Sequence, residues 1–156
     1  NSVELPKLHF PEYKFKLRSD TSGGQSLKIF DIVRGKYVRL NPEEWVRQHI
    51  LHFLIYDKHY PKSLTGVEKR VVVNGLERRY DVLIHDKDLK PLLLVECKSV
   101  DVKITQEVFD QAARYNLTVD ARLFVLTNGL QTYCCTLDHV NRTYHFLEEV
   151  PFYEKL

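Results

Sequence analysis

The sequence predicts a single α/β domain, of the α+β type, built on one mixed β-sheet. The order of patterns along the chain carries this prediction: a helix, two strands joined by an Asn-Gly turn, and a strand–helix–strand unit. A chain of 156 residues is about the size of one domain. Hydrophobic residues at 44% and charged residues at 28% match globular averages, which excludes disordered and coiled-coil classes.

The first helix is expected from about Pro42 to Tyr56. Asn41 suits the N-cap, proline is favoured at the first helical position, and Glu44 stands three residues after the cap. The apolar residues that follow recur at helical spacing. We expect them to face the core: Val46, Ile50, Phe53 and Leu54.

The residues before this helix, 1–40, are predicted to form an N-terminal arm and a short hairpin. A polar break at Ser19 to Ser26 ends the arm, and two short strands, 27–33 and 36–40, then flank Arg34-Gly35. Basic and aromatic residues of the arm can hold phosphates and stack on bases; the alternative is a solvated strand with an apolar face. These residues are Lys14, Lys16, Arg18, Tyr13 and Phe15.

The central strands are expected at residues 67–73, 76–85 and 89–98. The first two are rich in β-formers and are joined by Asn74-Gly75, a strong hairpin signal, so they should pair antiparallel. The third is the near-continuous apolar run typical of a strand that is buried on both faces. Its Pro91 must lie near the start, where a missing N–H donor is tolerated.

A second helix is predicted over residues 105–116, capped by Thr105, and a buried strand follows at 121–127. A strand–helix–strand crossover of this kind demands two parallel strands. Outer strands at 131–137 and 143–147 complete the predicted sheet. The core-facing positions expected in this helical segment are Ile104, Val108, Ala112 and Tyr115.

Two carboxylates and a lysine fall on the central strands. Glu96 and Lys98 are two residues apart and share a face, and Asp81 stands inside the preceding strand, where Asp is normally depleted. Two ionised carboxylates about 4 Å apart repel by roughly 4 kcal/mol at an effective dielectric of about 20. A divalent cation would compensate this repulsion, and oxygen ligands from Asp81, Glu96 and the backbone carbonyl of Cys97 suit Mg²⁺ or Mn²⁺. The alternative is an ion-pair cluster at the end of the sheet.

The same residues resemble a known motif. Asp81 followed by Glu96-Cys97-Lys98 is similar to the PD-(D/E)xK motif of nucleases, although Tyr80 replaces the expected proline. Gln111-Ala112-Ala113-Arg114-Tyr115 resembles the Q-x-x-x-Y helix motif of RecB-like members. Residues 41–48 and 127–129 resemble the N-terminal domain of type I restriction enzyme R subunits, and the resemblance covers about residues 40–147.

The resemblance implies a restriction-endonuclease-like αβββαβ core, which we assign to residues 41–150, and a Mg²⁺-dependent DNA endonuclease. It implies that Asp81 and Glu96 bind the metal and that Lys98 is the catalytic lysine. Glu44 is similar to the acidic residue that the family places on its first helix; the alternative is that it closes a capping box. Glu68 is a further candidate for a third acid.

Gln111 and Tyr115 stand four residues apart, on one face of the second helix. The resemblance implies that both face the substrate. The alternative is amphipathic packing with Tyr115 buried.

Charge and motifs limit the other functions. A net charge of +2 does not by itself indicate nucleic-acid binding, and no G-x-x-x-x-G-K-[ST] loop occurs, so we expect any ATP-driven motor on another chain. Three cysteines without disulfide or zinc spacing, and no apolar run near the ~20 residues of a membrane helix, favour a cytoplasmic protein without membrane contact. From the absence of Met we expect the chain to be truncated or processed.

The expected partners are DNA and other subunits of a restriction system. Two alternatives remain open: a non-catalytic DNA- or subunit-binding module of the same fold, and a structural or regulatory protein with an ion-paired sheet edge.

Overall fold

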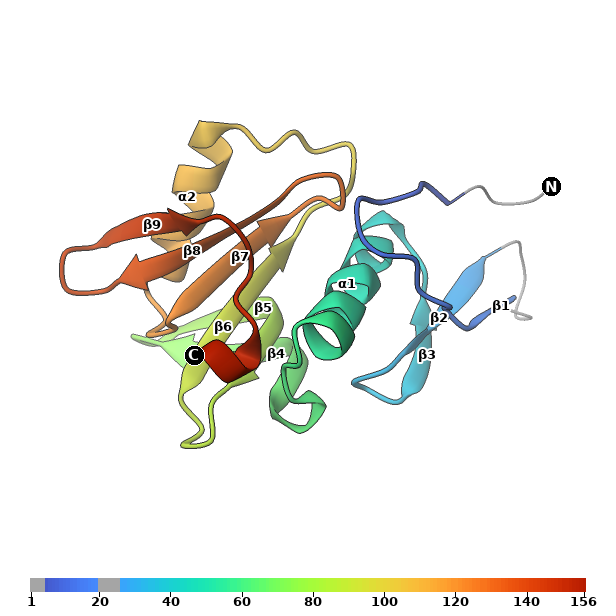
Figure 1. The fold of residues 1–156 in the computed structure, drawn as a ribbon, viewed down its shortest axis with the longest axis horizontal. Coiled ribbons are helices and arrows are strands. Elements are labelled where there is room, and N and C mark those ends of the chain that lie inside the picture. The colour runs from blue at the N-terminus through green and yellow to red at the C-terminus, as the bar shows by residue number, and fades with distance from the viewer. Residues whose placement is uncertain (1–4, 20–25) are drawn as a thin grey trace.

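The computed structural model describes residues 5–19 and 26–156, so most of the predicted polar break lies outside the described residues. Helix α1 (Pro42–His52) lies between a three-stranded and a six-stranded sheet (Figure 1). Helix α2 (Gln106–Asn116) packs on the other face of the six-stranded sheet. Within the described ranges, neither helix is long and apolar enough to cross a membrane.

The large sheet confirms the predicted mixed α/β architecture. Its strands lie in sequence order, and all neighbours are antiparallel except β6 and β7, which α2 connects as a parallel pair. With α1 in front, this order gives the expected αβββαβ core. The strands are β4 (Thr65–Val73), β5 (Leu76–His85), β6 (Pro91–Cys97), β7 (Leu123–Thr127), β8 (Thr132–Asp138) and β9 (Thr143–Leu147).

The small sheet contains the predicted hairpin, β2 (Leu27–Asp31) and β3 (Lys36–Arg39), which pair antiparallel. Strand β1 (Leu17–Ser19), at the end of the arm, is exposed and pairs with β2 as a third strand, in agreement with the solvated strand that the sequence offered as an alternative for the arm. Gly35, in the turn between β2 and β3, has a positive φ of 67°, a conformation that glycine adopts without strain.

Helix α1 begins as predicted, because the Asn41 side chain accepts the N–H of Glu44 over 2.7 Å. Its regular part ends at His52, and the chain continues as a π-helical turn, η1 (Phe53–Asp57). Val46, Ile50 and Leu54 are fully buried against the large sheet. Two short 3₁₀ turns, η2 (Lys62–Leu64) and η3 (Tyr153–Lys155), complete the described elements.

One core prediction for α2 is wrong. Tyr115 is 44% exposed, and its ring centroid lies 3.9 Å from the Arg78 guanidinium carbon. The buried stripe of the helix runs instead through Phe109, Ala112, Ala113 and Asn116, which recur at helical spacing. Tyr115 falls beside this stripe, and its ring packs against the Arg78 guanidinium instead of being buried in the core.

Candidate active site

Three carboxylates stand at matching positions on three neighbouring strands. Val67 lies opposite Val82 and Lys69 opposite Tyr80, which places Glu68 of β4 across from Asp81 of β5. Pairing of β5 with β6 begins at Val82 and Val95, so Asp81 and Glu96 are the next positions along the two strands. Glu68 has a positive φ of 54°, which marks a local break in the regular strand conformation at this row.

The Asp81 carboxylate fills the point where β5 and β6 stop pairing. Its Oδ2 accepts the backbone N–H of Cys97 over 2.7 Å, and its Oδ1 lies 3.5 Å from Nη1 of Arg47. Burial raises the pKa of Asp81, and the charges of Glu96 and Glu43 raise it further. The Cys97 N–H and the Arg47 guanidinium lower this pKa without cancelling the rise.

Glu96 and Lys98 lie together on one face of the strand end, as the alternation predicts. Nζ of Lys98 is 3.7 Å from Oε2 of Glu96. The backbone N–H of Lys98 donates to the carbonyl of Thr127 over 2.8 Å, which holds the lysine at the end of the parallel β6–β7 pair. Both side chains are partly exposed, so the amine and the carboxylate are accessible from solvent.

Arg47 of α1 connects the carboxylates. Its guanidinium contacts Glu44 at 2.6 Å, Glu68 at 3.2 Å and Asp81 at 3.5 Å. Burial alone would lower the pKa of Arg47, but the hydrogen bonds and charge of Glu44, with the charge of Asp81, keep it above its usual value. Arg47 is therefore a permanent cation that α1 places over the row of acids.

Glu44 is buried inside this ionic cluster. Its carboxylate accepts hydrogen bonds from Arg47, from Arg34 at 3.0 Å and from Gln48 at 3.1 Å. Only half of a capping box forms, because the Asn41 side chain caps the Glu44 N–H while the Glu44 carboxylate turns to the two arginines. In the described contacts Glu44 reaches Asp81 only through Arg47.

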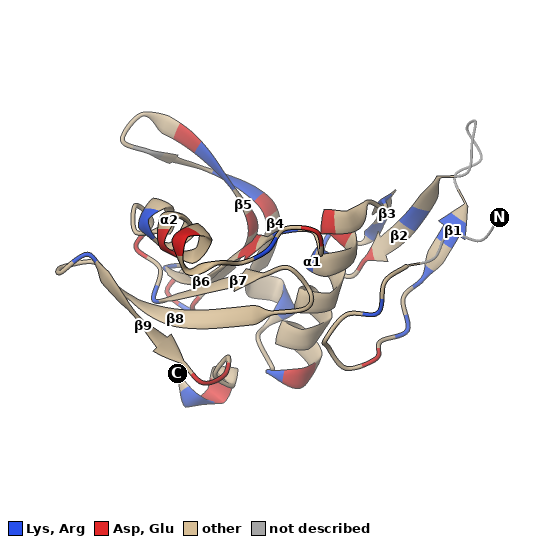
Figure 2. Ribbon diagram, turned by 90° about the horizontal axis from the view of Figure 1, so that it is seen from above, with Lys and Arg blue, Asp and Glu red and all other residues tan. Residues whose placement is uncertain are grey.

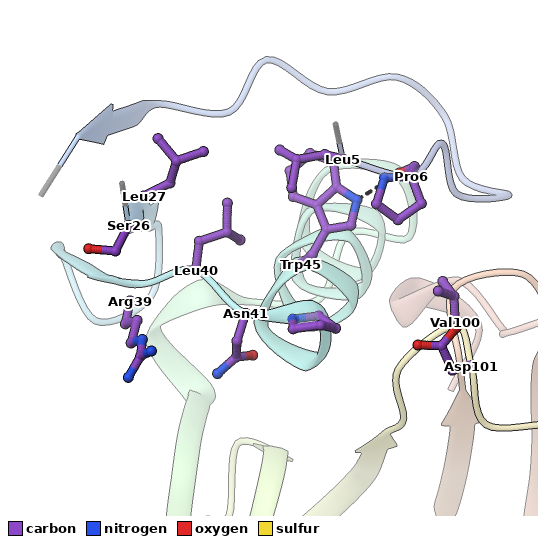
Figure 3. Close-up of a pocket in the computed structure, with 11 residues that line it drawn as sticks. Leu5, Pro6, Ser26, Leu27, Arg39, Leu40, Asn41, Trp45, Val100 and Asp101 are labelled. Carbon is purple, nitrogen blue, oxygen red and sulfur yellow. Dashed lines mark hydrogen bonds between the residues drawn. The ribbon is translucent and has the colours of Figure 1, made fainter. Parts of the chain in front are cut away.

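A cavity opens beside this site, between the arm, the small sheet and the start of α1 (Figure 3). Its volume is about 440 Å³. Trp45 forms part of its wall and donates from Nε1 to the carbonyl of Pro6 over 2.8 Å. Val100 and Asp101, from the loop after Lys98, form another part of the wall. The short segment from Glu96 to Asp101 therefore connects the carboxylates with the cavity.

The comparisons with known proteins identify the family. A family model described as type I restriction enzyme R protein N terminus (HSDR_N) matches residues 42–151. The chain belongs to this family. A search of curated proteins found no match. Among solved structures, the chain is similar to a protein from Anabaena variabilis that is described as a nuclease candidate of the DUF820 family, with 12% identity, a TM-score of 0.47, and coverage of 83% of this chain and 84% of that one.

The R protein N-terminal domain offers ligands that fit a hard cation. No group of three or more His, Cys, Asp or Glu side chains is placed to hold a metal ion in the described part of the chain. A Mg²⁺ ion is nevertheless commonly held by one or two carboxylates with water and substrate phosphate. Burial raises the pKa of the Cys97 thiol well above its usual range, so this residue would contribute its backbone carbonyl and not a thiolate. Asp81 and Glu96 fit this ligand set.

The two predicted substrate residues lie on α2. Gln111 is exposed, and Tyr115 is exposed beneath Arg78, which stands three residues before Asp81 on β5. Tyr115 of α2 therefore contacts β5, the strand that carries Asp81, through Arg78, whereas no described contact connects Gln111 with the carboxylates. Neither residue contacts Glu96 or Lys98 directly in the described contacts.

Sequence reasoning missed two members of the site. Arg47 lies within the segment 41–48 that resembles the family, but it was given no role there, and only its spacing of three residues from Glu44 indicates a partner. Glu43, exposed on the first turn of α1, raises the pKa of Asp81, although only its neighbour Glu44 was a predicted site residue. The side on which each acid lies depends on how α1 rotates against the sheet, and adjacent residues point in different directions on a helix.

Proposed function

We propose that this domain is a metal-dependent DNA endonuclease that hydrolyses phosphodiester bonds within a restriction-modification or DNA-processing system. The observation that carries the proposal is the adjacency of Asp81, Glu96 and Lys98 at the open end of the β5–β6 pair. The family supports a restriction-enzyme context, with other subunits of the system as partners in a cytoplasmic assembly.

The residues divide the chemistry among them. Asp81 and Glu96, with the carbonyl of Cys97, would hold Mg²⁺ or Mn²⁺. Such an ion lowers the pKa of water and stabilises the charge that develops on the phosphate. Lys98 lies 3.7 Å from Glu96, where it can orient the attacking water and donate to the phosphate. Glu68 and Glu44 act through Arg47, which positions the Asp81 carboxylate.

The substrate would reach this centre across α2 and the end of the sheet. Gln111 and Tyr115 are proposed to contact DNA from α2, because both side chains are exposed. The Arg78 guanidinium over the Tyr115 ring adds a positive charge beside that path. Gln111 and Tyr115 would thus bind the DNA and take no part in hydrolysis of the phosphodiester bond.

The experiment is plasmid cleavage by the purified chain with Mg²⁺, with Mn²⁺ and with EDTA. Wild type should nick or linearise the plasmid only with metal. Asp81→Asn and Glu96→Gln should lose this activity, while Glu148→Gln, an exposed acid after β9, should retain it. Cleavage that persists in EDTA, or in folded Asp81→Asn, would contradict the proposal.

A second function has one observation in its favour. Arg47 already lies against Asp81 and Glu68, so part of the acidic charge is compensated without a metal. A non-catalytic DNA- or subunit-binding module of the same fold would keep this ion-pair cluster. It predicts no cleavage with any metal, but unchanged DNA binding in Asp81→Asn.

A further inference from the structure

Basic residues concentrate in the part of the chain that precedes α1. Residues 13–40 contain seven of the 23 Lys and Arg residues but only two of the 21 Asp and Glu residues. The rest of the chain has an excess of acids. Figure 2 shows Lys and Arg on each strand of the small sheet. The modest net charge of the whole chain therefore hides one strongly basic element.

Three cations form a row across the small sheet. Arg18 of β1 lies opposite Lys28 of β2, and Lys28 lies opposite Arg39 of β3. Neighbouring strands are about 4.8 Å apart, so the row places three positive charges within roughly 10 Å. Like charges directly opposite each other destabilise a sheet. No carboxylate of the described residues forms an ion pair with any of the three.

Two aromatic rings continue this row on the same face. Phe30 and Tyr37 are cross-strand partners, two residues from Lys28 and Arg39 respectively, and their ring centroids are 5.3 Å apart. The guanidinium carbon of Arg18 lies 4.1 Å from the Tyr37 centroid, and Nζ of Lys16 lies 5.4 Å from that of Phe30. Each aromatic ring is therefore accompanied by a cation.

The opposite face of this sheet is turned towards α1. Ile29 and Asp31 of β2 are fully buried, and Asp31 accepts a hydrogen bond from Gln48 of α1 over 3.0 Å. Side chains alternate along a strand, so Lys28 and Phe30 point away from α1. The outer face carries Lys16, Arg18, Lys28, Phe30, Tyr37 and Arg39, and we call it the basic-aromatic face.

Hollows extend this face at both ends. Phe30 and Lys16 also line a hollow of about 490 Å³ that adds two lysines, Lys14 and Lys62, one acid, Glu12, and the aromatic ring of Tyr56. At the other end, Arg39 also lines the cavity shown in Figure 3, to which the loop after Lys98 contributes. A chain bound along the face can therefore pass Arg39 towards the candidate active site.

We propose that the basic-aromatic face binds single-stranded DNA outside the Asp81 site. Phosphates would contact Arg18, Lys28 and Arg39, and bases would stack on Phe30 and on the outer plane of the Arg18 guanidinium. A single strand fits better than a duplex because only unpaired, unstacked bases offer their faces to aromatic rings. An acidic protein segment would use the cations but not the rings. The choice of DNA rests on the proposed function; the binding surface itself does not.

The test is fluorescence anisotropy of a labelled oligothymidine of about 16 nucleotides, the upper site size of comparable single-strand binders. EDTA is present throughout, so only binding is measured. The triple variant Arg18→Gln, Lys28→Gln and Arg39→Gln should bind at least about tenfold more weakly, and the slope of log K against log salt should fall by about 2, because three phosphate contacts are lost. The pair Phe30→Leu and Tyr37→Leu should weaken single-strand binding by about tenfold and duplex binding much less.

The matched control removes the same charge elsewhere. Lys87→Gln, Lys90→Gln and Arg122→Gln alter exposed residues at the β5–β6 turn and before β7, and should change the affinity by less than about twofold. Equal losses in both triple variants, unchanged affinity in the first, or stronger competition by polyglutamate than by oligothymidine would overturn the proposal. If the triple variant does not fold, Arg18→Gln alone, at an exposed site, gives the same comparison.

The outcome is separable from that of the nuclease proposal. Failure of wild type to cleave, with the expected loss of binding in the triple variant, would refute the nuclease and leave the binding face. Cleavage that requires Asp81, with full binding in the triple variant, would do the reverse.

Discussion

The Asp81 carboxylate accepts the backbone N–H of Cys97 over 2.7 Å. This bond joins β5 to β6 just beyond Val82 and Val95, where their regular pairing ends. The side chain thereby takes the place of a ladder hydrogen bond and stays at the end of the strand pair. Because Cys97 stands between Glu96 and Lys98, the same bond fixes the segment that carries both of those side chains.

Arg47 should be essential for stability. Arg47→Met leaves the buried Glu44 carboxylate with one fewer cation and also unpairs Asp81. Removing one partner of a buried ion pair typically costs about 3–5 kcal/mol of unfolding free energy. Urea denaturation measures this loss. The double variant Glu44→Gln with Arg47→Met should recover part of it, and an Arg47→Met variant as stable as wild type would show that the cluster is not structural.

Lys98 should matter for cleavage and not for folding. Its side chain is partly exposed and forms one ion pair, at 3.7 Å from Glu96, so Lys98→Ala should alter stability by less than about 1 kcal/mol. The cleavage rate should fall by about 100-fold or more, as for other groups that stabilise transition-state charge. Single-turnover cleavage measures the rate. Exposed Lys103 offers the matched control, Lys103→Ala.

Substitution by Gln should have different effects at Glu43 and at Glu44. Glu44 accepts hydrogen bonds from Arg34, Arg47 and Gln48, so Glu44→Gln should lower the unfolding free energy by about 1–3 kcal/mol. Glu43 is exposed, and its charge raises the pKa of Asp81, so Glu43→Gln should change the metal dependence of cleavage with little loss of stability. Thermal unfolding and metal titrations of both variants test this. If instead Glu44→Gln changed the metal dependence and Glu43→Gln lowered the stability, the role at the metal site would belong to Glu44.

Two buried histidines should make the packing of the arm pH-dependent. His49 and His52 lie among Phe15, Tyr13 and Trp45, and burial lowers the pKa of both. The unfolded chain therefore binds protons at a higher pH than the folded one. Their contribution to stability is complete above about pH 6.5 and is lost as the pH falls from there towards their lowered pKa values.

Urea unfolding at about pH 7.5 and about pH 5.5 measures this difference. The double variant His49→Gln and His52→Gln should lose less stability than wild type over the interval. His145→Gln, at an exposed site, should behave as wild type. An unchanged pH dependence in the double variant would place the titrating groups elsewhere.

The elements were predictable where local pattern and burial agree. The strand β5 and the helix α2 match the sequence argument within a residue, because Asn74-Gly75 fixes one end of the hairpin and Thr105 caps the helix. Tyr115 was misplaced because an aromatic residue at helical spacing is compatible with either burial or a cation contact. Only the position of Arg78 on the neighbouring strand decides between the two.

The site was predictable in part. Asp81, Glu96 and Lys98 follow from strand alternation and from a motif within the chain. The role of Arg47 depends on which strand positions α1 packs against, and the apolar stripe of the helix does not specify that Glu68 of β4 and Asp81 of β5 lie beside it. The cation row could not be predicted from the sequence, because Arg18, Lys28 and Arg39 are distant in sequence and adjacent only through strand register.

The most direct test of the metal site is calorimetric titration of Mn²⁺ into wild type, Asp81→Asn, Glu96→Gln and Glu107→Gln. We expect one saturable site in wild type and in Glu107→Gln, with binding abolished in the other two while their thermal midpoints stay at or above the wild-type value. Equal Mn²⁺ affinity in wild type and in folded Asp81→Asn would contradict the account, because Asp81 would then not be a ligand of the catalytic metal.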